Sequence, residues 1–190
     1  MKETTRQKLI DATFEAVFSH GYQGAALADI LKNANVHKGS MYHYFGSKKE
    51  MALAAIQERV SARNLEKYGK ILELKSGYLE EFIKTLKDTE VRDFRRGCPI
   101  ANLIQEMSNL DEDFDHTMKS IYEEFRDYIQ RILQKAIDVK EMEECDTEKL
   151  ALFIVSTVEG AILSAKASGD VKDYEDTVDI LISMLWQYKI

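Results

Sequence analysis

The stretch that decides the fold is ALADILKNANVHKGSMYHYF, residues 26–45. Its first half carries apolar residues at the spacing of one face of a short helix: Leu27, Ile30, Leu31 and Ala34. In its second half, residues 39–45 allow two helical turns, in which Met41 and Phe45 lie four residues apart and share a face. We therefore expect two short helices separated by a tight turn.

The turn between these helices has the residue types that a steep helix crossing needs. A helix-turn-helix requires a small residue where the helices touch and a residue that tolerates positive φ in the turn. Ala34 is small, and Asn35 is one of the few non-glycine residues that enter the left-handed region at low cost. Val36 then supplies an apolar side chain between the helices. The pattern predicts a helix-turn-helix over residues 26–45.

With Met41 and Phe45 turned inward, the outward face of the second helix is polar, aromatic and basic. It carries Lys38, Ser40, Tyr42, His43 and Tyr44. Such side chains donate to phosphates, hydrogen-bond to base edges and pack on thymine methyl groups in the major groove. Any one of the aromatic residues also fits the core of a small three-helix unit. The prediction of a DNA-binding face therefore depends on their clustering with Lys38, Lys48 and Lys49.

Helical signals extend over the rest of the chain. An earlier helix is indicated by Thr4 or Thr5 as its cap, Gly21 as its stop and an apolar stripe of Ile10, Phe14, Val17 and Phe18. A long helix should run from Lys48 to about Leu74. Five more should lie between breaks near residues 76–77, 96–99, 109–111, 141–146 and 168–170. We expect an all-α fold of about nine helices, with a three-helix N-terminal unit and a C-terminal helical bundle.

The composition agrees with an all-helical intracellular protein. The 190 residues are 45% hydrophobic and 31% charged, with one proline and nine glycines, which disfavours disorder and a turn-rich β sandwich. We see no signal-peptide core and no apolar run long enough to span a bilayer, so we expect a cytoplasmic protein without a membrane partner. Cys98 and Cys145 lie far apart and outside any CxxC arrangement, which is typical of a reduced protein.

Charge is distributed unevenly along the chain. The net charge is −7, yet residues 1–50 hold seven Lys or Arg and five Asp or Glu, a net +2. The remainder holds 19 basic and 28 acidic residues, a net −9. A basic head on an acidic body would orient the head toward phosphates. An excess of this size over fifty residues also arises by ordinary fluctuation.

On these residues the N-terminal segment resembles the DNA-binding domain of the TetR family of transcriptional regulators. The resemblance covers residues 4 to about 60, in TTRQKLIDATFEAVFSHGYQG and DILKNANVHKGSMYHYFGSKKEMALAAI. It implies a DNA-binding domain at 1–47, with its helix-turn-helix at about 26–45, and a ligand-binding and dimerisation domain at 48–190. The stretch RGCPIANLIQEMS, residues 96–108, also resembles a motif in the sensor domain of some such regulators.

The resemblance implies which residues contact operator DNA. Lys38, Ser40, Tyr42 and Lys48 would mainly bind the phosphate backbone, and Lys38, Gly39, Tyr42 and His43 would face the floor of the groove. The full expected set is His37, Lys38, Gly39, Ser40, Tyr42, His43, Tyr44 and Lys48. The sequence departs from the family pattern in three places: Ala25 or Ala26 replaces a polar cap, Asn35 replaces the turn glycine, and His37 replaces a Ser or Thr.

The last two helices are unusually apolar, and a helix that is apolar on more than one face needs more than one partner. In TetR-like proteins these helices form a four-helix interface with a twofold mate, so the resemblance implies a homodimer on a palindromic operator. The alternative is an ordinary monomer core. The expected interface residues are Phe153, Ile154, Val158, Ala161, Ile162, Ala165, Val178, Leu181 and Leu185.

Aromatic and sulfur-containing residues gather between the fourth and seventh helices. Such side chains can line an adaptable apolar pocket, and a small-molecule effector bound there would tilt the fourth helix and change the separation of the two heads. The same residue types also build ordinary cores. The expected lining residues are Tyr68, Phe82, Cys98, Leu103, Ile104, Met107, Met118, Tyr122 and Phe125. Repression is the usual outcome in the family.

Two rival classes remain. An enzyme would need a catalytic pair such as Cys98 with His116, or Glu106 with Asp111, but neither pair belongs to a recognisable nucleophilic or acid/base arrangement. The four histidines lack metal-site spacing, so we expect no metal, no cofactor and no enzymatic activity. The third class is an all-helical interaction module whose head no longer binds DNA.

Overall fold

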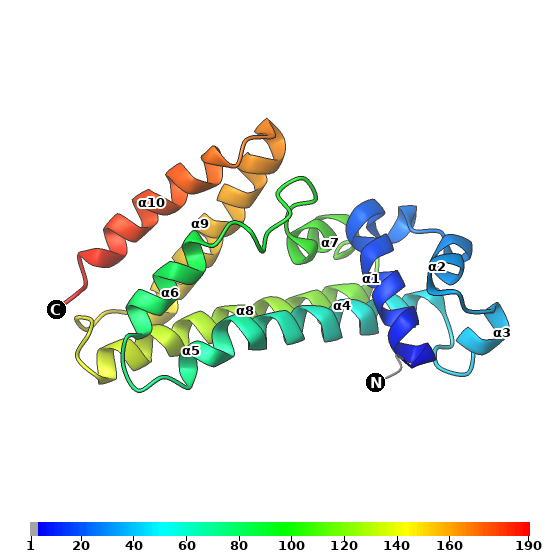
Figure 1. The fold of residues 1–190 in the computed structure, drawn as a ribbon, viewed down its shortest axis with the longest axis horizontal. Helices are drawn as coiled ribbons and strands as arrows, with labels where there is room; N and C mark the ends of the chain where they lie inside the picture. The colour runs from blue at the N-terminus through cyan, green and yellow to red at the C-terminus, as the bar shows by residue number, and fades with distance from the viewer. Residues whose placement is uncertain (1–3) are drawn as a thin grey trace. The chain divides into compact units, whose positions relative to one another are not determined.

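The computed structural model describes residues 4–190, and the regular elements in that range are all helical (Figure 1). An isolated β-bridge joins Met142 and Lys189. The helices are α1 (Thr5–Gly24), α2 (Leu27–Ala34), α3 (Lys38–Met41), α4 (Lys48–Asn64), η1 (Leu65–Gly69), α5 (Lys70–Leu72), α6 (Tyr78–Lys87), α7 (Pro99–Met107), α8 (Glu112–Asp138), α9 (Thr147–Ser168) and α10 (Lys172–Trp186).

The segments α4, η1 and α5 form one continuous helix, because Asn64 and Lys70 at their junctions have right-handed helical φ and ψ. Counted this way, residues 4–190 contain nine helices, and the prediction of an all-α fold is confirmed. The long fourth helix ends at Leu72, close to the expected Leu74. The irregular segment before α7 spans residues 88–98 and is longer than the expected break at 96–99.

The helices form two compact units. Unit 1 comprises the chain up to residue 61 together with 99–121, and unit 2 comprises 62–98 together with 122–190. The two compact units therefore do not coincide with the two domains predicted from the sequence, whose boundary lies between residues 47 and 48. That domain boundary stays a prediction. The first three residues of that predicted N-terminal domain lie outside the described residues.

In unit 1, α7 holds the end of α1. Gly21 has a φ of +73°, and the N–H groups of Tyr22 and Gln23 donate to the Glu106 carboxylate at 2.9 and 2.8 Å. A Cβ at Gly21 would lie 2.5 Å from a Glu106 carboxylate oxygen, so both the backbone and the available space require glycine. The predicted stop of the first helix is thus a left-handed residue, secured by a side chain 85 positions away.

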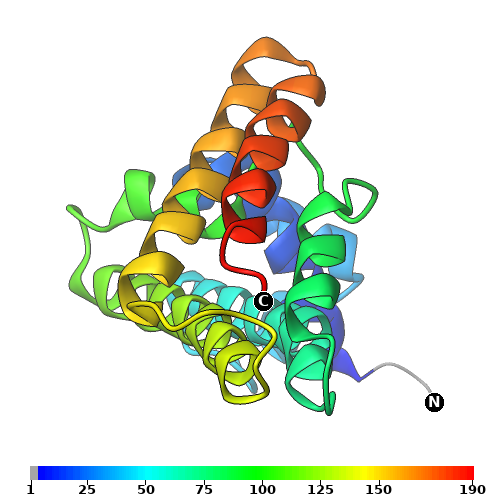
Figure 2. The ribbon, with the colours of Figure 1, turned by 90° about the vertical axis from the view of Figure 1, so that its left-hand side faces the viewer.

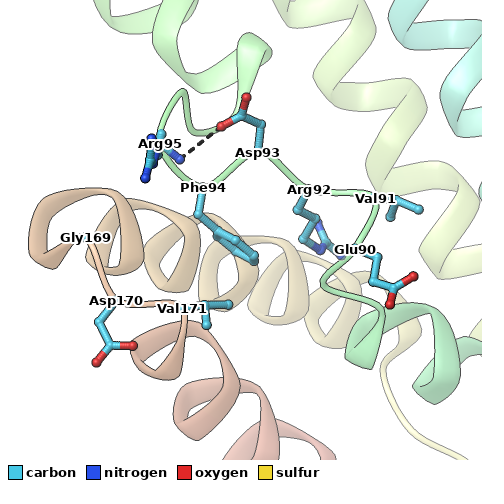
Figure 3. Close-up of a pocket in the computed structure, with 9 residues that line it drawn as sticks. All are labelled: Glu90, Val91, Arg92, Asp93, Phe94, Arg95, Gly169, Asp170 and Val171. Carbon is cyan, nitrogen blue, oxygen red and sulfur yellow. Dashed lines mark hydrogen bonds between the residues drawn. The ribbon is translucent and has the colours of Figure 1, made fainter.

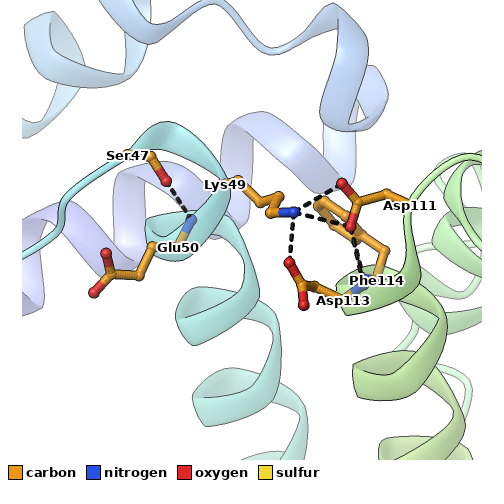
Figure 4. A network of polar contacts seen from close by, with 6 residues as sticks. All are labelled: Ser47, Lys49, Glu50, Asp111, Asp113 and Phe114. Atoms are coloured by element: carbon orange, nitrogen blue, oxygen red, sulfur yellow. Dashed lines mark hydrogen bonds and ion pairs between the residues drawn. The ribbon is translucent and has the colours of Figure 1, made fainter.

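The start of α4 is fixed by polar contacts (Figure 4). The Ser47 hydroxyl accepts a hydrogen bond from the Glu50 N–H at 3.0 Å, which caps the helix. The Lys49 ammonium donates to Asp111 at 2.9 Å and pairs with Asp113 at 2.5 Å. These contacts connect α4 to the loop before α8 and to its first turn within unit 1.

In unit 2, α9 and α10 run antiparallel and side by side (Figures 1 and 2). Asp146 caps α9 by accepting from the Lys149 N–H at 3.1 Å, and Gly169 ends α9 in the left-handed conformation. Tyr174 of α10 is fully buried and donates its hydroxyl hydrogen to the Leu86 carbonyl oxygen at 2.8 Å. This bond ties α10 to the end of α6.

Helix α9 has the length and apolar composition of a membrane-spanning helix, which the sequence analysis did not anticipate. Its buried face, which includes Ile154, Val158 and Ala161, packs into the core of unit 2. A core helix of a helical bundle has the same composition, so packing within the bundle accounts for this feature.

Candidate functional site

The turn between α2 and α3 has the predicted geometry. Asn35 lies in the left-handed region, with φ 52° and ψ 48°, and its N–H bonds to the carbonyl oxygens of Leu31 and Lys32. The Val36 N–H returns to the Leu31 oxygen at 3.0 Å. Ala34 is buried and Val36 is half-buried. Backbone hydrogen bonds and one left-handed asparagine therefore set the turn, without a glycine.

Two buried residues hold α3 and the turn that follows it. Met41 is fully buried and Phe45 is 3% exposed, whereas Tyr42 is 53% exposed and Tyr44 is 45% exposed. Lys38, Gly39 and His43 are exposed and Ser40 is half-buried. The Lys38 ammonium lies 5.9 Å from the centre of the Tyr42 ring, within range of a weak cation–π contact. Apart from the half-buried Ser40, the predicted polar and aromatic residues of this segment are therefore exposed.

The N-termini of α2 and α3 lack side-chain caps. Neither Ala26 nor His37 makes a side-chain hydrogen bond at its helix start. The His37 imidazole is exposed, and the carbonyl oxygen of His37 accepts the first hydrogen bonds of α3. The first N–H groups of α2 are therefore not satisfied by a cap, which favours an anion at this end of the helix. The departures from the family pattern at these two positions remove capping hydroxyls and leave the backbone geometry intact.

The predicted DNA contact Lys48 is engaged inside unit 1. Its ammonium donates to the Tyr22 carbonyl oxygen at 2.6 Å and lies 4.3 Å from the centre of the Tyr22 ring. Burial lowers the pKa of Lys48, and the nearby Glu106 carboxylate partly offsets this effect. Lys49 is also occupied, because its hydrogen bonds to the carboxylates of Asp113 and Asp111 raise its pKa. A phosphate contact by Lys48 would use the hydrogens that Tyr22 leaves free.

The nine predicted effector-binding residues fall into two groups. Tyr68, Phe82 and Phe125 pack together in unit 2, with ring centres 6.5 Å apart for Tyr68 and Phe82 and 5.5 Å apart for Tyr68 and Phe125. Cys98 and Tyr122 pack against the same core. The other four residues belong to α7 and α8 in unit 1, and they are Leu103, Ile104, Met107 and Met118.

Sequence reasoning missed the polar groups buried in unit 2. Atoms buried without a hydrogen-bond partner include Asn64 Nδ2, Arg92 Nε and Nη2, and Glu159 Oε2. The pKa of Lys67 is lowered to about 7, mainly by burial. No periodicity could have revealed these groups, because they come from separate elements: α4, η1, the 88–98 segment and α9. A charged residue within an apolar helix stripe, such as Glu159, was the available signal.

The predicted dimer interface needs correction. Eight of its nine residues are less than 9% exposed in the single chain, because α9 and α10 bury them against each other and against unit 2, so they form core rather than surface. Phe153 alone is exposed, at 44%. Neighbouring apolar positions on the same two helices are the exposed ones: Leu152, Leu163, Ile180, Met184 and Trp186.

The two carboxylates considered for catalysis have structural partners. Glu106 accepts from two backbone N–H groups after Gly21, and Asp111 pairs with Lys49. His116 is exposed and belongs to unit 1, whereas Cys98 belongs to unit 2. Residues 4–190 hold no group of three or more metal-ligating side chains.

Comparison with known proteins agrees with this geometry. A family described as "Bacterial regulatory proteins, tetR family" matches residues 9–55, and one described as "Tetracyclin repressor-like, C-terminal domain" matches residues 78–181. Transcriptional regulator AcuR of Cereibacter sphaeroides is 34% identical over 84% of this chain and 75% of its own. The HTH-type transcriptional repressor NemR of Escherichia coli is 28% identical over 60% of this chain and 59% of its own. A crystal structure of a regulatory protein TetR from Rhodobacter sphaeroides matches with a TM-score of 0.81 at 29% identity, covering 95% of this chain and 98% of that one.

Proposed function

The chain belongs to the TetR family of transcriptional regulators, and on that premise we propose that it is a repressor that binds a palindromic operator as a homodimer and responds to a small-molecule effector. The observation that supports DNA binding most directly is the exposed polar and aromatic face of α3. The name of NemR as a repressor supports the direction of regulation. This function gives the chain a role in the cytoplasm and requires no catalytic group.

The proposed DNA contacts follow from exposure and chemistry. Lys38 and Ser40 donate to phosphates, Tyr42 combines a hydroxyl donor with an apolar ring, and His43 reaches a base edge in the major groove. The position of Gly39 is open, because a Cβ there would meet nothing within 4 Å in the free protein. The missing side chain would let the backbone approach the groove closely. His37, Tyr44 and Lys48 flank these contacts. Met41 and Phe45 anchor the face from behind.

The proposed homodimer is supported by the exposed apolar residues of α9 and α10. Phe153, Gly160 and Leu163 lie on one side of α9, and Ile180 and Met184 lie one turn apart on α10. A Cβ at Gly160 would meet nothing within 4 Å, so this side of α9 is open to the close approach of another helix. A twofold mate would cover these residues and present two copies of α3 to successive major grooves.

A gel-shift experiment with the DNA upstream of the chain's own gene tests the proposal. Specific retardation that weakens steeply with salt is expected, and Tyr42→Ala should abolish it while the circular dichroism spectrum stays unchanged. Tyr188→Ala, which removes a half-buried tyrosine from unit 2, is the control and should bind normally. Unchanged DNA binding by Tyr42→Ala would contradict the assignment of α3.

A further inference from the structure

Unit 2 contains a π-helical turn, η1, within an otherwise α-helical stretch, and such turns are frequent at functional sites. η1 carries Lys67 and the buried Tyr68, whose ring centre lies 5.5 Å from that of Phe125. The π-helical turn thus brings a lysine and a tyrosine into the packed interior.

Positive charge concentrates around Lys67. Burial is the main reason that its pKa is lowered to about 7, and the charges of Arg92 and Arg63 lower it further, whereas Asp88 raises it. Arg63 donates to the Val91 carbonyl oxygen at 2.7 Å, which ties the end of α4 to the 88–98 segment. Lys67 is therefore close to two like charges, with Asp88 as the opposing charge at Lys67, and an added anion would favour the charged form of this lysine.

Arg92 shares a side-chain hydrogen bond with Tyr68 but keeps two donors that no acceptor meets. Its guanidinium carbon lies 5.0 Å from the centre of the Tyr174 ring, and its Nε and Nη2 are buried without a hydrogen-bond partner. The N–H bonds of these two nitrogens point the same way along one edge of the guanidinium, which is the edge that pairs with both oxygens of a carboxylate. The Asn64 side-chain nitrogen is another buried donor without a partner. Unpaired buried donors cost free energy, so a ligand that accepts from them gains affinity.

Glu159, the acid whose charge interacts with Arg92, does not accept from the unpaired Arg92 donors. Glu159 of α9 interacts with the charge of Arg92, yet its Oε2 is itself buried without a hydrogen-bond partner. Burial raises the pKa of Glu159, which favours the neutral carboxyl, while a hydrogen bond with Cys98 opposes the rise. A neutral carboxyl can donate to a ligand oxygen.

Arg92 also lines an open pocket of about 640 Å³ in unit 2, large enough for a small molecule (Figure 3). Residues 90–95 form one side of the pocket and Gly169–Val171 form the other. Phe94 is directed into the space between them and packs on Tyr174, with ring centres 4.9 Å apart. The pocket also carries Arg95 and the acids Glu90, Asp93 and Asp170, so charges of both signs line it.

We propose that the cluster of Arg63, Asn64, Lys67 and Arg92 binds the carboxylate of a small organic acid, which is the effector class of this regulator. Arg92 Nε and Nη2 would hold the two carboxylate oxygens, with Lys67 and Asn64 as further donors. The ring of Phe94, which lines the pocket, offers apolar surface to the remainder of the ligand. This assignment rests on the proposed function as an effector-responsive regulator.

Isothermal titration calorimetry of the intact protein without DNA tests the proposal. The probes are hexanoate and benzoate, with hexanamide and benzamide as uncharged analogues and inorganic phosphate as a second anion. We expect an acid of this series to bind at least tenfold more tightly than its amide and than phosphate. Arg92→Gln should weaken acid binding at least tenfold, and Arg92→Lys, which keeps the charge but loses the planar fork, should also weaken it.

Arg131→Gln is the matched control, because it makes the same charge change at an exposed site on α8 and should leave binding unchanged. Thermal unfolding checks the fold, and Arg92→Gln should unfold at or above the wild-type temperature, since it removes unpaired buried donors. The proposal is overturned if no acid binds at millimolar concentration, if the amides or phosphate bind as well as the acids, or if Arg92→Gln binds normally. Because no DNA is present, a chain that fails to bind operator can still pass this test, and the reverse also holds.

Discussion

The helix-turn-helix and the buried polar cluster of unit 2 are built in opposite ways. In the first, a short continuous segment satisfies its own requirements: Asn35 supplies the left-handed turn, and Met41 and Phe45 anchor α3. In the second, Lys67, Arg92 and Glu159 come from three separate elements and keep buried polar atoms or charges without matching partners. The helix-turn-helix meets its packing and hydrogen-bonding needs within one segment, which makes it rigid. The buried polar groups of unit 2 lack partners, so a ligand that pairs with them would stabilise the folded chain.

The largest predicted effect concerns two adjacent residues of α10, one buried and one exposed. Leu181 is 1% exposed and Ile180 is 67% exposed. Leu181→Asp should unfold the protein or lower the free energy of unfolding by about 4 kcal/mol or more, because it buries an unpaired charge. Ile180→Asp should keep the helical content and shift the sedimentation coefficient from dimer to monomer. If Leu181→Asp were folded and monomeric while Ile180→Asp stayed dimeric, the interface would consist of the residues predicted from the sequence, and the exposed residues would not form it.

A second comparison uses two glycines of unit 1. Gly21→Ala forces a Cβ against Glu106 at positive φ, so it should lower the free energy of unfolding by about 1–3 kcal/mol. Gly39→Ala lies in α3 with open space around it, so it should leave the free energy of unfolding unchanged or raise it slightly. Gly39→Ala should nevertheless weaken operator binding if the backbone approaches the groove. Urea unfolding measures the free energy of unfolding of both variants, and fluorescence anisotropy measures their operator affinity. Equal losses of unfolding free energy in Gly21→Ala and Gly39→Ala would refute the account of Gly21.

The smallest predicted effect concerns Lys67 and pH. The pKa of Lys67 is about 7 in the folded chain against an ordinary 10.5, so between these values the unfolded chain holds a proton that the folded chain lacks. The cost of burying this lysine is therefore largest below pH 7 and disappears above about pH 10.5. Lys67→Met should raise the free energy of unfolding by roughly 1–2 kcal/mol at pH 6 and by nothing near pH 11. A pH-independent gain would refute the assigned pKa.

How far the sequence could predict each region follows from this difference in construction. The spacing of Ile30, Leu31 and Ala34, with Asn35 after them, predicted α2 and the turn, whereas the second helix, expected over residues 39–45, is the shorter Lys38–Met41. The all-α fold followed from caps and breaks such as Asp146 and Gly169. These signals are local, and local signals survive in a one-dimensional pattern.

The other sites depend on tertiary packing, which periodicity does not reveal. The apolar stripe of α9 and α10 gave the correct residue types but not which side each helix turns to the other, so eight core residues were assigned to the interface. The contact of Glu106 with the end of α1 and the cluster around Arg92 join residues far apart in the chain. Burial and pairing of such groups become visible only with coordinates.

The central claim, that the outward face of α3 binds DNA, is tested most directly by the salt dependence of operator affinity for Lys38→Ala and for Lys135→Ala, an exposed control on α8. Fluorescence anisotropy between about 50 and 200 mM salt gives the slope of log affinity against log salt, and each phosphate contact contributes about 1 to it. We predict that Lys38→Ala lowers the slope by about 1 and that Lys135→Ala leaves it unchanged. Identical slopes and affinities for wild type and Lys38→Ala would contradict the account.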